Sequence, residues 1–179
     1  LDHFGNRVNW LFLDLPHDRF SLTLRAEVAV AFPPPPDPAA TLPWEQVATA
    51  RDGGPGQWQA AEFAFHSPMA APDRGVASYV AESFPAGRPV LAGVIDLLHR
   101  IRRDFRFQPG ITTIATPVGR VLSQKAGVCQ DFSHLMIAGL RSLGIPARYV
   151  SGYIRTHPPP GQARRRGADQ SHAWVGVWL

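Results

Sequence analysis

The chain has 179 residues, of which 45% are hydrophobic and 18% are charged, and its formal net charge is +4. This length is enough for one sizeable hydrophobic core, or for one core and part of a second. The longest clean apolar stretch, residues 135–140, is far too short to cross a membrane, which takes roughly 18 apolar residues. A single cysteine excludes an internal disulfide and a multi-cysteine metal site.

The positive charge comes mostly from arginine, which is concentrated at residues 100–106 and 164–166. An excess of positive charge can favour the binding of a nucleic acid or of an acidic substrate, or it can simply increase solubility. Because the sequence has neither an aromatic RNA-binding motif nor zinc-finger spacing, we expect no nucleic-acid partner. We also expect no membrane association, and a lone cysteine without a leader segment suits a cytoplasmic location. The oligomeric state is left open.

The first part of the chain is predicted to form β structure. Residues 7–31 contain "RVNWLFLDL", a turn at "PHD", and "FSLTLRAEVAV", which alternates between apolar and polar residues. Alternation with a period of two is typical of a half-buried strand in an antiparallel sheet. Two strands cannot hold a sheet alone. We therefore expect a fragment of an N-terminal β domain, with further sequence before Leu1 and after Leu179.

A proline-rich stretch marks the predicted domain boundary. "FPPPPDP", residues 32–38, removes four consecutive backbone donors and is typical of a stiff linker. We therefore divide the chain into residues 1–38, the β remnant with its linker, and residues 39–179. Residues 39–72 are predicted to be an ordered connection with little regular structure, apart from a short helix beginning at "PWEQV".

Helices are predicted from residue 73 onward. Asp73 suits the N-cap of "DRGVASYVAESF" (73–84), and Pro89 suits the first turn of the helix that continues to Phe105. "PVGRVLSQKAG" (117–127) is predicted to be a short helix after an extended stretch. The apolar stripe of the longest of these helices consists of Val90, Leu91, Val94, Ile95, Leu98, Ile101 and Phe105.

The next predicted helix begins at the single cysteine, Cys129, and is stopped by Gly144 and Pro146. It is followed by two predicted strands, "ARYVSGYIR" (147–155) and "SHAWVGVWL" (171–179), with a proline- and arginine-rich loop between them. Helices packed on a short antiparallel sheet define an α+β core. The apolar stripe of the helix consists of Phe132, Leu135, Met136, Leu140 and Leu143.

Cys129 has two competing interpretations: a nucleophile, or a small apolar filler of the core. A thiol reacts as the thiolate, which the free amides and aligned dipoles of a helix N-terminus stabilise. His172 opens a strand that should return beside this helix, 43 residues after Cys129 (172 − 129), and is the best candidate for a general base. Lys125 can add positive potential, and His134 is interpreted as structural. On the residues alone, the nucleophile and the filler are about equally favoured.

No convincing third group orients the imidazole of His172. Asp131 lies two residues after Cys129, which is about 200° around the helix, so it should face away. Asp169 lies three residues before His172 in an extended stretch, and its side chain should be too distant. A zinc site at His172 is not expected, because the histidines are scattered and the cysteine is single. We expect neither a metal nor an organic cofactor.

"GVCQDFSHLMIAGLRSLGIPARYVSGYI" and "SHAWVGVWL" together closely resemble the transglutaminase-like superfamily, and in particular its bacterial members regarded as cysteine proteases. The resemblance extends over essentially the whole chain. It implies a papain-like core in which Cys129 is the nucleophile and His172 the base. The aspartate of the family would lie about fifteen residues beyond the histidine, past Leu179. Gly176 stands where relatives commonly carry glutamate.

The resemblance implies acyl chemistry on a protein or peptide substrate. Cys129 would form a thioester, with its own backbone amide donating to the oxyanion. Gln124 would be either a second donor or a solvated side chain. Water would resolve the thioester in a hydrolase, whereas an amine would resolve it in a true transglutaminase. A catalytically retired fold that serves as a binding or scaffold module, working through the basic loop 161–167, is the third possibility. Trp174 would pack beside the site or within the core.

Overall fold

The computed structural model of the protein describes residues 1–23, 27–52, 58–154, 160–161 and 171–179. The chain divides into two compact units, Leu1–Pro34 and Pro35–Leu179. The division falls within the proline run, where the backbone lacks donors for sheet hydrogen bonds. The basic loop 161–167 lies almost wholly outside the described residues.

The first unit differs from the prediction of β structure at residues 7–31. In its described residues, 1–23 and 27–34, no strand is assigned. The apolar side chains of the predicted strands are exposed, and Trp10 retains 93% of its accessible surface. The alternating pattern supplies one apolar face, but a strand also needs neighbours that satisfy its backbone groups. Near the start of this unit, the carboxylate of Asp2 accepts the backbone amides of Phe4 and Asn6 and so holds a turn.

The second unit begins with short helical segments, where the sequence predicted a connection with one short helix. The predicted helix at "PWEQV" is α1, Trp44–Ala48, and α2 covers Trp58–Ala61. Short 3-10 turns lie at Pro38–Ala40, Thr49–Asp52 and Glu62–Ala64.

The longer helices lie close to their predicted positions. They are α3, Arg74–Ala81; α4, Val90–Asp104; α5, Val118–Gln124; and α6, Cys129–Ser142. The carboxylate of Asp73 caps α3 by accepting the amide of Val76 at 2.9 Å, as predicted.

The ends of α5 and α6 depend on left-handed backbone. Lys125 ends α5 with a φ of 51°, an uncommon conformation for a residue with a side chain. Gly144 follows the C-cap Leu143 of α6 with a φ of 82°, which glycine adopts without strain. The chain can therefore reverse at once into the following strand.

The larger sheet consists of β3, Ala147–Tyr153, and β4, Ser171–Val177, which pair antiparallel as predicted. Tyr149 lies opposite Val175, and Gly152 lies opposite His172. A small parallel pair joins β1, Arg106–Phe107, to β2, Ala126–Gly127. It ties the segment after α4 to the residues that precede α6.

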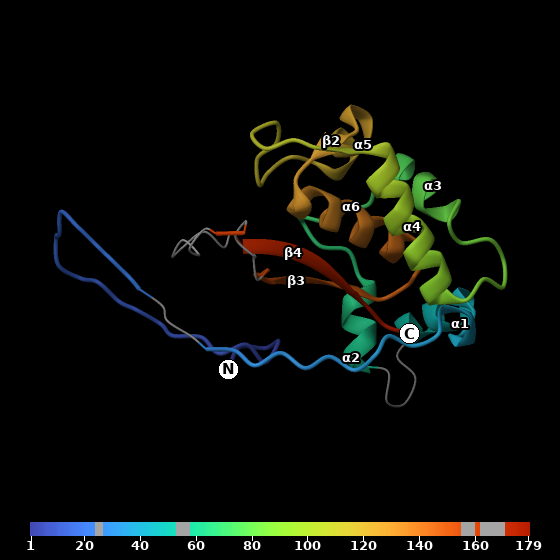
Figure 1. The fold of residues 1–179 in the computed structure, drawn as a ribbon, viewed down its shortest axis with the longest axis horizontal. Coiled ribbons are helices and arrows are strands. Elements are labelled where there is room, and N and C mark those ends of the chain that lie inside the picture. The colour runs from blue at the N-terminus through green and yellow to red at the C-terminus, as the bar shows by residue number, and fades with distance from the viewer. Residues whose placement is uncertain (24–26, 53–57, 155–159, 162–170) are drawn as a thin grey trace. The chain divides into compact units, whose positions relative to one another are not determined.

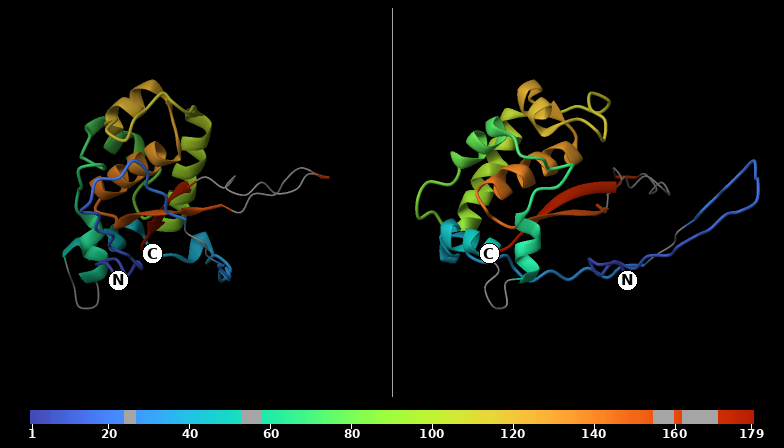
Figure 2. Two further views of the ribbon diagram at one scale, coloured as in Figure 1. Left: turned by 90° about the vertical axis from the view of Figure 1, so that its left-hand side faces the viewer. Right: turned by 180° about the vertical axis from the view of Figure 1, so that it is seen from behind.

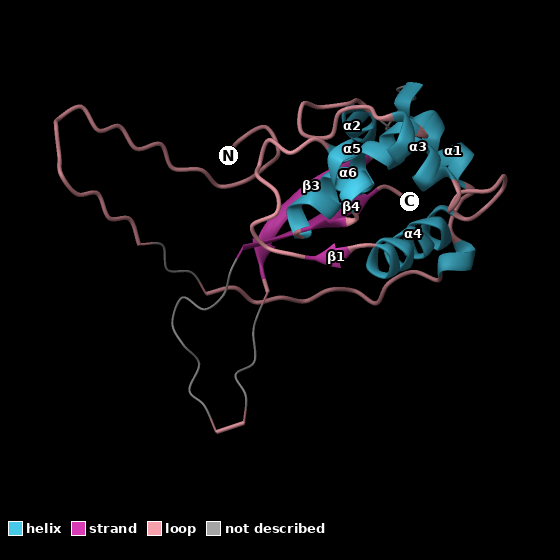
Figure 3. Cartoon of the chain, turned by 90° about the horizontal axis from the view of Figure 1, so that it is seen from above, coloured by secondary structure: helices cyan, strands magenta, loops and turns pink. Residues whose placement is uncertain are grey.

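Helix α6 is the central element of this unit (Figure 1). It contacts α3 and α5 as well as both strands of the larger sheet. In the view from behind, α6 again lies along the sheet, and α3 and α5 lie on the side of α6 that faces away from the sheet (Figure 2). Seen from above, α6 lies over β3 and β4 while α4 runs alongside (Figure 3). The core is therefore built around α6, and its fully buried members include Leu97, Leu135, Ile137, Leu140 and Ile145.

A buried arginine fastens the end of α6 to β3. The guanidinium of Arg141 donates to the carbonyl of Ala147 through Nε at 3.1 Å and Nη2 at 2.8 Å. It also donates to the hydroxyl of Ser67 at 3.2 Å, and burial lowers its pKa. These bonds fix the turn between helix and strand. In the described part of the chain, no helix has the length and apolar character that crossing a membrane requires.

Candidate active site

Cys129 is the first residue of α6, and its side chain is half-buried. The backbone amides of a first helical turn have no carbonyl partner within the helix. They stabilise negative charge at that end, which favours the thiolate of a cysteine placed there. The position therefore combines partial access to solvent with the free backbone amides of a helix N-terminus.

Asp131, which the sequence suggested would face away, holds the first turn of α6. It is 6% exposed, and its Oδ2 accepts the backbone amide of Val128 at 2.7 Å. The same oxygen accepts the hydroxyl of Thr112 at 2.7 Å. Asp131 is the third residue of the helix, so it reaches back to the N-cap amide as the acidic member of a capping box does.

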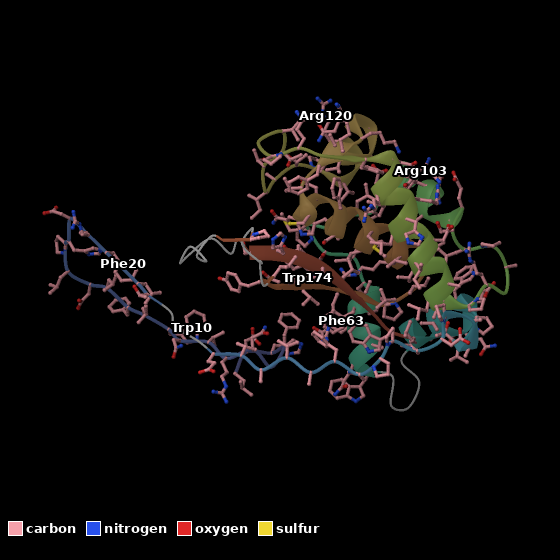
Figure 4. All side chains as sticks on the ribbon, in the orientation of Figure 1. Trp10, Phe20, Phe63, Arg103, Arg120 and Trp174 are labelled. Atoms are coloured by element: carbon pink, nitrogen blue, oxygen red, sulfur yellow. The ribbon has the colours of Figure 1, made fainter. Side chains whose placement is uncertain are left out.

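A cavity of about 590 Å³ borders the thiol. Its walls come from α4, from α6 including Cys129, and from Ala173, Trp174 and Val175 of β4. Figure 4 shows Trp174 on β4, where 38% of its surface is exposed. Trp174 therefore borders the site instead of filling the core. The other apolar residues that line the cavity are Val94, Ile95, Leu98, Ile101, Phe105, Phe107, Phe132 and Met136.

His172 lies on β4 next to Ala173, which shares the cavity with Cys129. Successive residues of a strand point to opposite faces. His172 accordingly shares a face with Trp174, whose ring centroid is 6.3 Å from that of the imidazole, while Val175 packs against the core. Among the described side chains, His172 forms no hydrogen bond with the Cys129 thiol or with a carboxylate. Its role as a base stays a prediction.

His134 and Tyr149 form a second pair beside α6. Their ring centroids are 5.2 Å apart, and Tyr149 belongs to the strand next to β4. Burial lowers the pKa of His134, although the charge of Asp131 acts in the opposite direction. Burial raises the pKa of Tyr149, and a negative charge on Cys129 raises it further. Tyr149 is therefore a neighbour of the thiol that the sequence did not indicate.

Lys125 and Gln124 make contacts that differ from their suggested roles. The Nζ of Lys125 lies 4.5 Å from the ring centroid of Tyr79 and 4.6 Å from that of Phe105, so it binds aromatic faces. The amide of Gln124 donates to the carbonyl of Ala126 at 2.8 Å. That bond engages Gln124 in the turn before α6, where it supports the backbone near the thiol.

The described side chains do not gather three or more His, Cys, Asp or Glu residues closely enough to hold a metal ion. The functional groups near Cys129 are its own thiol at a helix N-terminus, the hydroxyl of Tyr149, and the imidazole of His172 on the neighbouring strand. Such groups suit nucleophilic attack and proton transfer.

Comparisons with known proteins place this site in a family. The profile of the Transglutaminase-like superfamily matches residues 78–179, more than half of the 179 residues. Uncharacterized proteins of Mycobacterium tuberculosis and Mycobacterium bovis are 41% identical over 180 residues, which covers 99% of this chain. The chain spans 56% of the length of these relatives.

A crystal structure gives an independent comparison. The "putative cysteine protease" from Cytophaga hutchinsonii is 28% identical, with a TM-score of 0.53, over 66% of this chain and 38% of that one. The matching profile includes α6 with Cys129 and β4 with His172, and the likeness to a solved structure agrees with the α+β fold. The chain belongs to the transglutaminase-like superfamily.

Proposed function

We propose that the protein is a cysteine hydrolase that acts on protein or peptide carbonyls through Cys129, with His172 as the general base. The observation that carries the proposal is the position of Cys129. It is a half-buried thiol in the first turn of α6, and it borders a cavity that the strand of His172 also lines. A cysteine that merely fills a core has no need of this position.

In the proposed reaction, the thiol proton of Cys129 moves to the imidazole of His172 as sulfur attacks the carbonyl carbon. The oxyanion receives a hydrogen bond from the Cys129 amide. The carbon–nitrogen bond then breaks, and the amine leaves with the proton from the imidazolium, which leaves a thioester. Water adds to the thioester, releases the acid and returns the proton to sulfur. For the first transfer, the imidazole of His172 must come within hydrogen-bond reach of the Cys129 thiol.

The cavity supports a substrate whose acyl portion is apolar. Its volume of about 590 Å³ lies within the roughly 300–1,000 Å³ typical of ligand pockets. Its lining is almost entirely aliphatic and aromatic, and Arg102 is the charged residue in it. An apolar side chain next to the attacked carbonyl would gain free energy by leaving water there.

Alkylation of the single cysteine tests the nucleophile and the base. We expect iodoacetamide to modify Cys129 rapidly at pH 6, and His172→Ala to slow the reaction about tenfold, because the thiolate loses its imidazolium partner. His99→Ala, at an exposed position of α4, is the matched control and should keep the original rate. Equal rates for the protein and His172→Ala would instead favour a catalytically retired binding or scaffold module.

The acceptor that resolves the thioester separates hydrolysis from amine transfer. We expect peptide amides to yield acids and to incorporate little of an added primary amine. Efficient incorporation of such an amine into a glutamine-containing protein would instead identify a transglutaminase. Cys129→Ser should abolish either reaction, and this loss would tie the activity to the thiol.

A further inference from the structure

The first turn of α6 is joined to the segment before α5 by one buried carboxylate. Oδ2 of Asp131 accepts both the Val128 amide and the Thr112 hydroxyl, each at 2.7 Å. The carboxylate of Asp131 thus bonds Val128, directly before Cys129, and also Thr112, which lies 19 positions before Asp131 in the chain. A group with these two bonds can transmit the position of the Thr112 segment to the thiol.

The surrounding backbone is shaped to admit this carboxylate. A Cβ atom added at Gly127 would lie 2.8 Å from Oδ2 of Asp131 and 2.9 Å from its Cβ, closer than real Cβ contacts. Gly127 also accepts the amide of Gln108 at 2.8 Å. The segment that carries Thr112 is therefore fastened at two points to the residues that lead into Cys129.

We propose that Asp131 is a positioning residue for Cys129, held by Thr112, and that its negative charge sets the pH at which the thiol ionises. A fixed carboxylate in the same turn disfavours the thiolate. The hydroxyl of Thr112 draws part of that charge away, because a donated hydrogen bond stabilises and screens the oxygen. The helix N-terminus and the carboxylate therefore act on the thiol in opposite directions.

Other charged or titratable groups surround Cys129, and the comparison between variants must hold them constant. His134 belongs to α6 and Tyr149 to β3, while Lys125 is bound against aromatic rings. Substitutions at Thr112 leave these groups unchanged. Asp131→Asn also removes the negative charge that raises the pKa of His134, so Thr112→Val and Thr112→Ser give the comparison in which the neighbouring groups stay constant. On the neighbouring elements, His172 belongs to β4, Arg148 and Tyr153 to β3, Arg106 to β1, and Arg102, Arg103 and Asp104 to α4.

The test is the pH dependence of iodoacetamide alkylation, which reports on Cys129 alone because the chain has no other cysteine. Asp131→Asn keeps the shape and an acceptor oxygen but removes the charge. We expect it to lower the midpoint of the pH profile by roughly half a pH unit, about threefold in rate below the midpoint. Thr112→Val keeps the charge but removes the donor, so we expect a rise of about 0.3 pH unit, and Thr112→Ser should restore the original midpoint.

Opposite shifts in Asp131→Asn and Thr112→Val support the proposal, because a purely structural role would change thermal stability without this pattern. Midpoints that stay fixed, or that move in the same direction, overturn it. If Asp131→Asn fails to fold, the contrast between Thr112→Val and Thr112→Ser decides alone. This role of Asp131 rests on the proposed nucleophile Cys129, but it can be refuted independently of the proposed base His172. Loss of the His172 effect would refute the base while these shifts could still be measured.

Discussion

Among single residues, His134 has surroundings that couple folding to protonation. It is half-buried on α6, and its ring packs against that of Tyr149 at an interplanar angle of 34°. Burial lowers its pKa below the ordinary value of 6.5 because the charged imidazolium loses hydration. In the pH range below 6.5, the unfolded chain therefore binds more protons at this site than the folded chain does.

We expect the free energy of unfolding to fall as the pH drops from 7.5 to 5, since protons bind preferentially to the unfolded state in that window. Stability from the neutral His134 is present above pH 6.5 and is lost as the pH falls through the lower folded-state pKa. Urea unfolding at a series of pH values measures this slope. His134→Gln should make the slope shallower, whereas His99→Gln, at an exposed site, should leave it unchanged. Identical slopes for the protein and His134→Gln would contradict the assignment.

For single residues, the sequence predicted those features that depend only on the position of a residue along a helix. Cys129 begins α6 as expected, because the preceding glycine and the apolar stripe define the start of the helix. The contacts of Asp131 escaped prediction because helical periodicity describes the direction of a side chain and not a backward turn to the N-cap amide. An acid three positions after a helix start is the signal that could have indicated it.

At the level of elements, the approach of α3 to α6 depends on a missing side chain. Gly139 of α6 faces Val80 of α3, and a Cβ atom there would lie 2.1 Å from Cγ2 of Val80. No real Cβ makes so close a contact, so the two helices could not keep their separation with alanine at this position. The core between them is therefore fitted to a glycine.

Replacing Gly139 by alanine should lower the free energy of unfolding by about 1–3 kcal/mol through overpacking. In an open helix position the same change would stabilise by about 1 kcal/mol, so the sign alone is informative. Val80→Ala also destabilises, by leaving a cavity. The double variant should lose less than the sum of the two single losses, because each change relieves the other. Strictly additive losses in urea unfolding would contradict the close approach.

The elements themselves were largely predictable, and their burial was less so. α3, α4, α6, β3 and β4 lie within a few residues of their predicted bounds, because caps and periodicity are local properties. Leu98 was assigned to the buried stripe of α4 but is 55% exposed and lines the cavity, while Leu97 is fully buried. Which of two neighbouring residues on a helix is buried depends on the elements that pack against the helix, and a single sequence does not contain that information.

At the scale of the whole molecule, the chain concentrates its packing in one unit. The buried apolar cluster consists of residues between Val47 and Ala147, and the partly buried residues that pack against it lie between Trp44 and Val177, all within Pro35–Leu179. In Leu1–Pro34, large apolar side chains such as Trp10 and Phe12 are exposed in the described residues. An exposed apolar side chain gains nothing from the hydrophobic effect.

We therefore expect residues 35–179 to fold without residues 1–34. The shortened protein should keep a single cooperative unfolding transition with a midpoint in urea close to that of the 179-residue chain, because the same apolar cluster stabilises both. Trp10→Ser in the longer chain is the matched control and should leave the midpoint unchanged, since that side chain is 93% exposed. Circular dichroism and tryptophan fluorescence, followed together, measure the transition. A shortened protein that unfolds without cooperativity would mean that residues 1–34 contribute to the stability of the helical unit, and the division at the proline run would then not separate independent folding units.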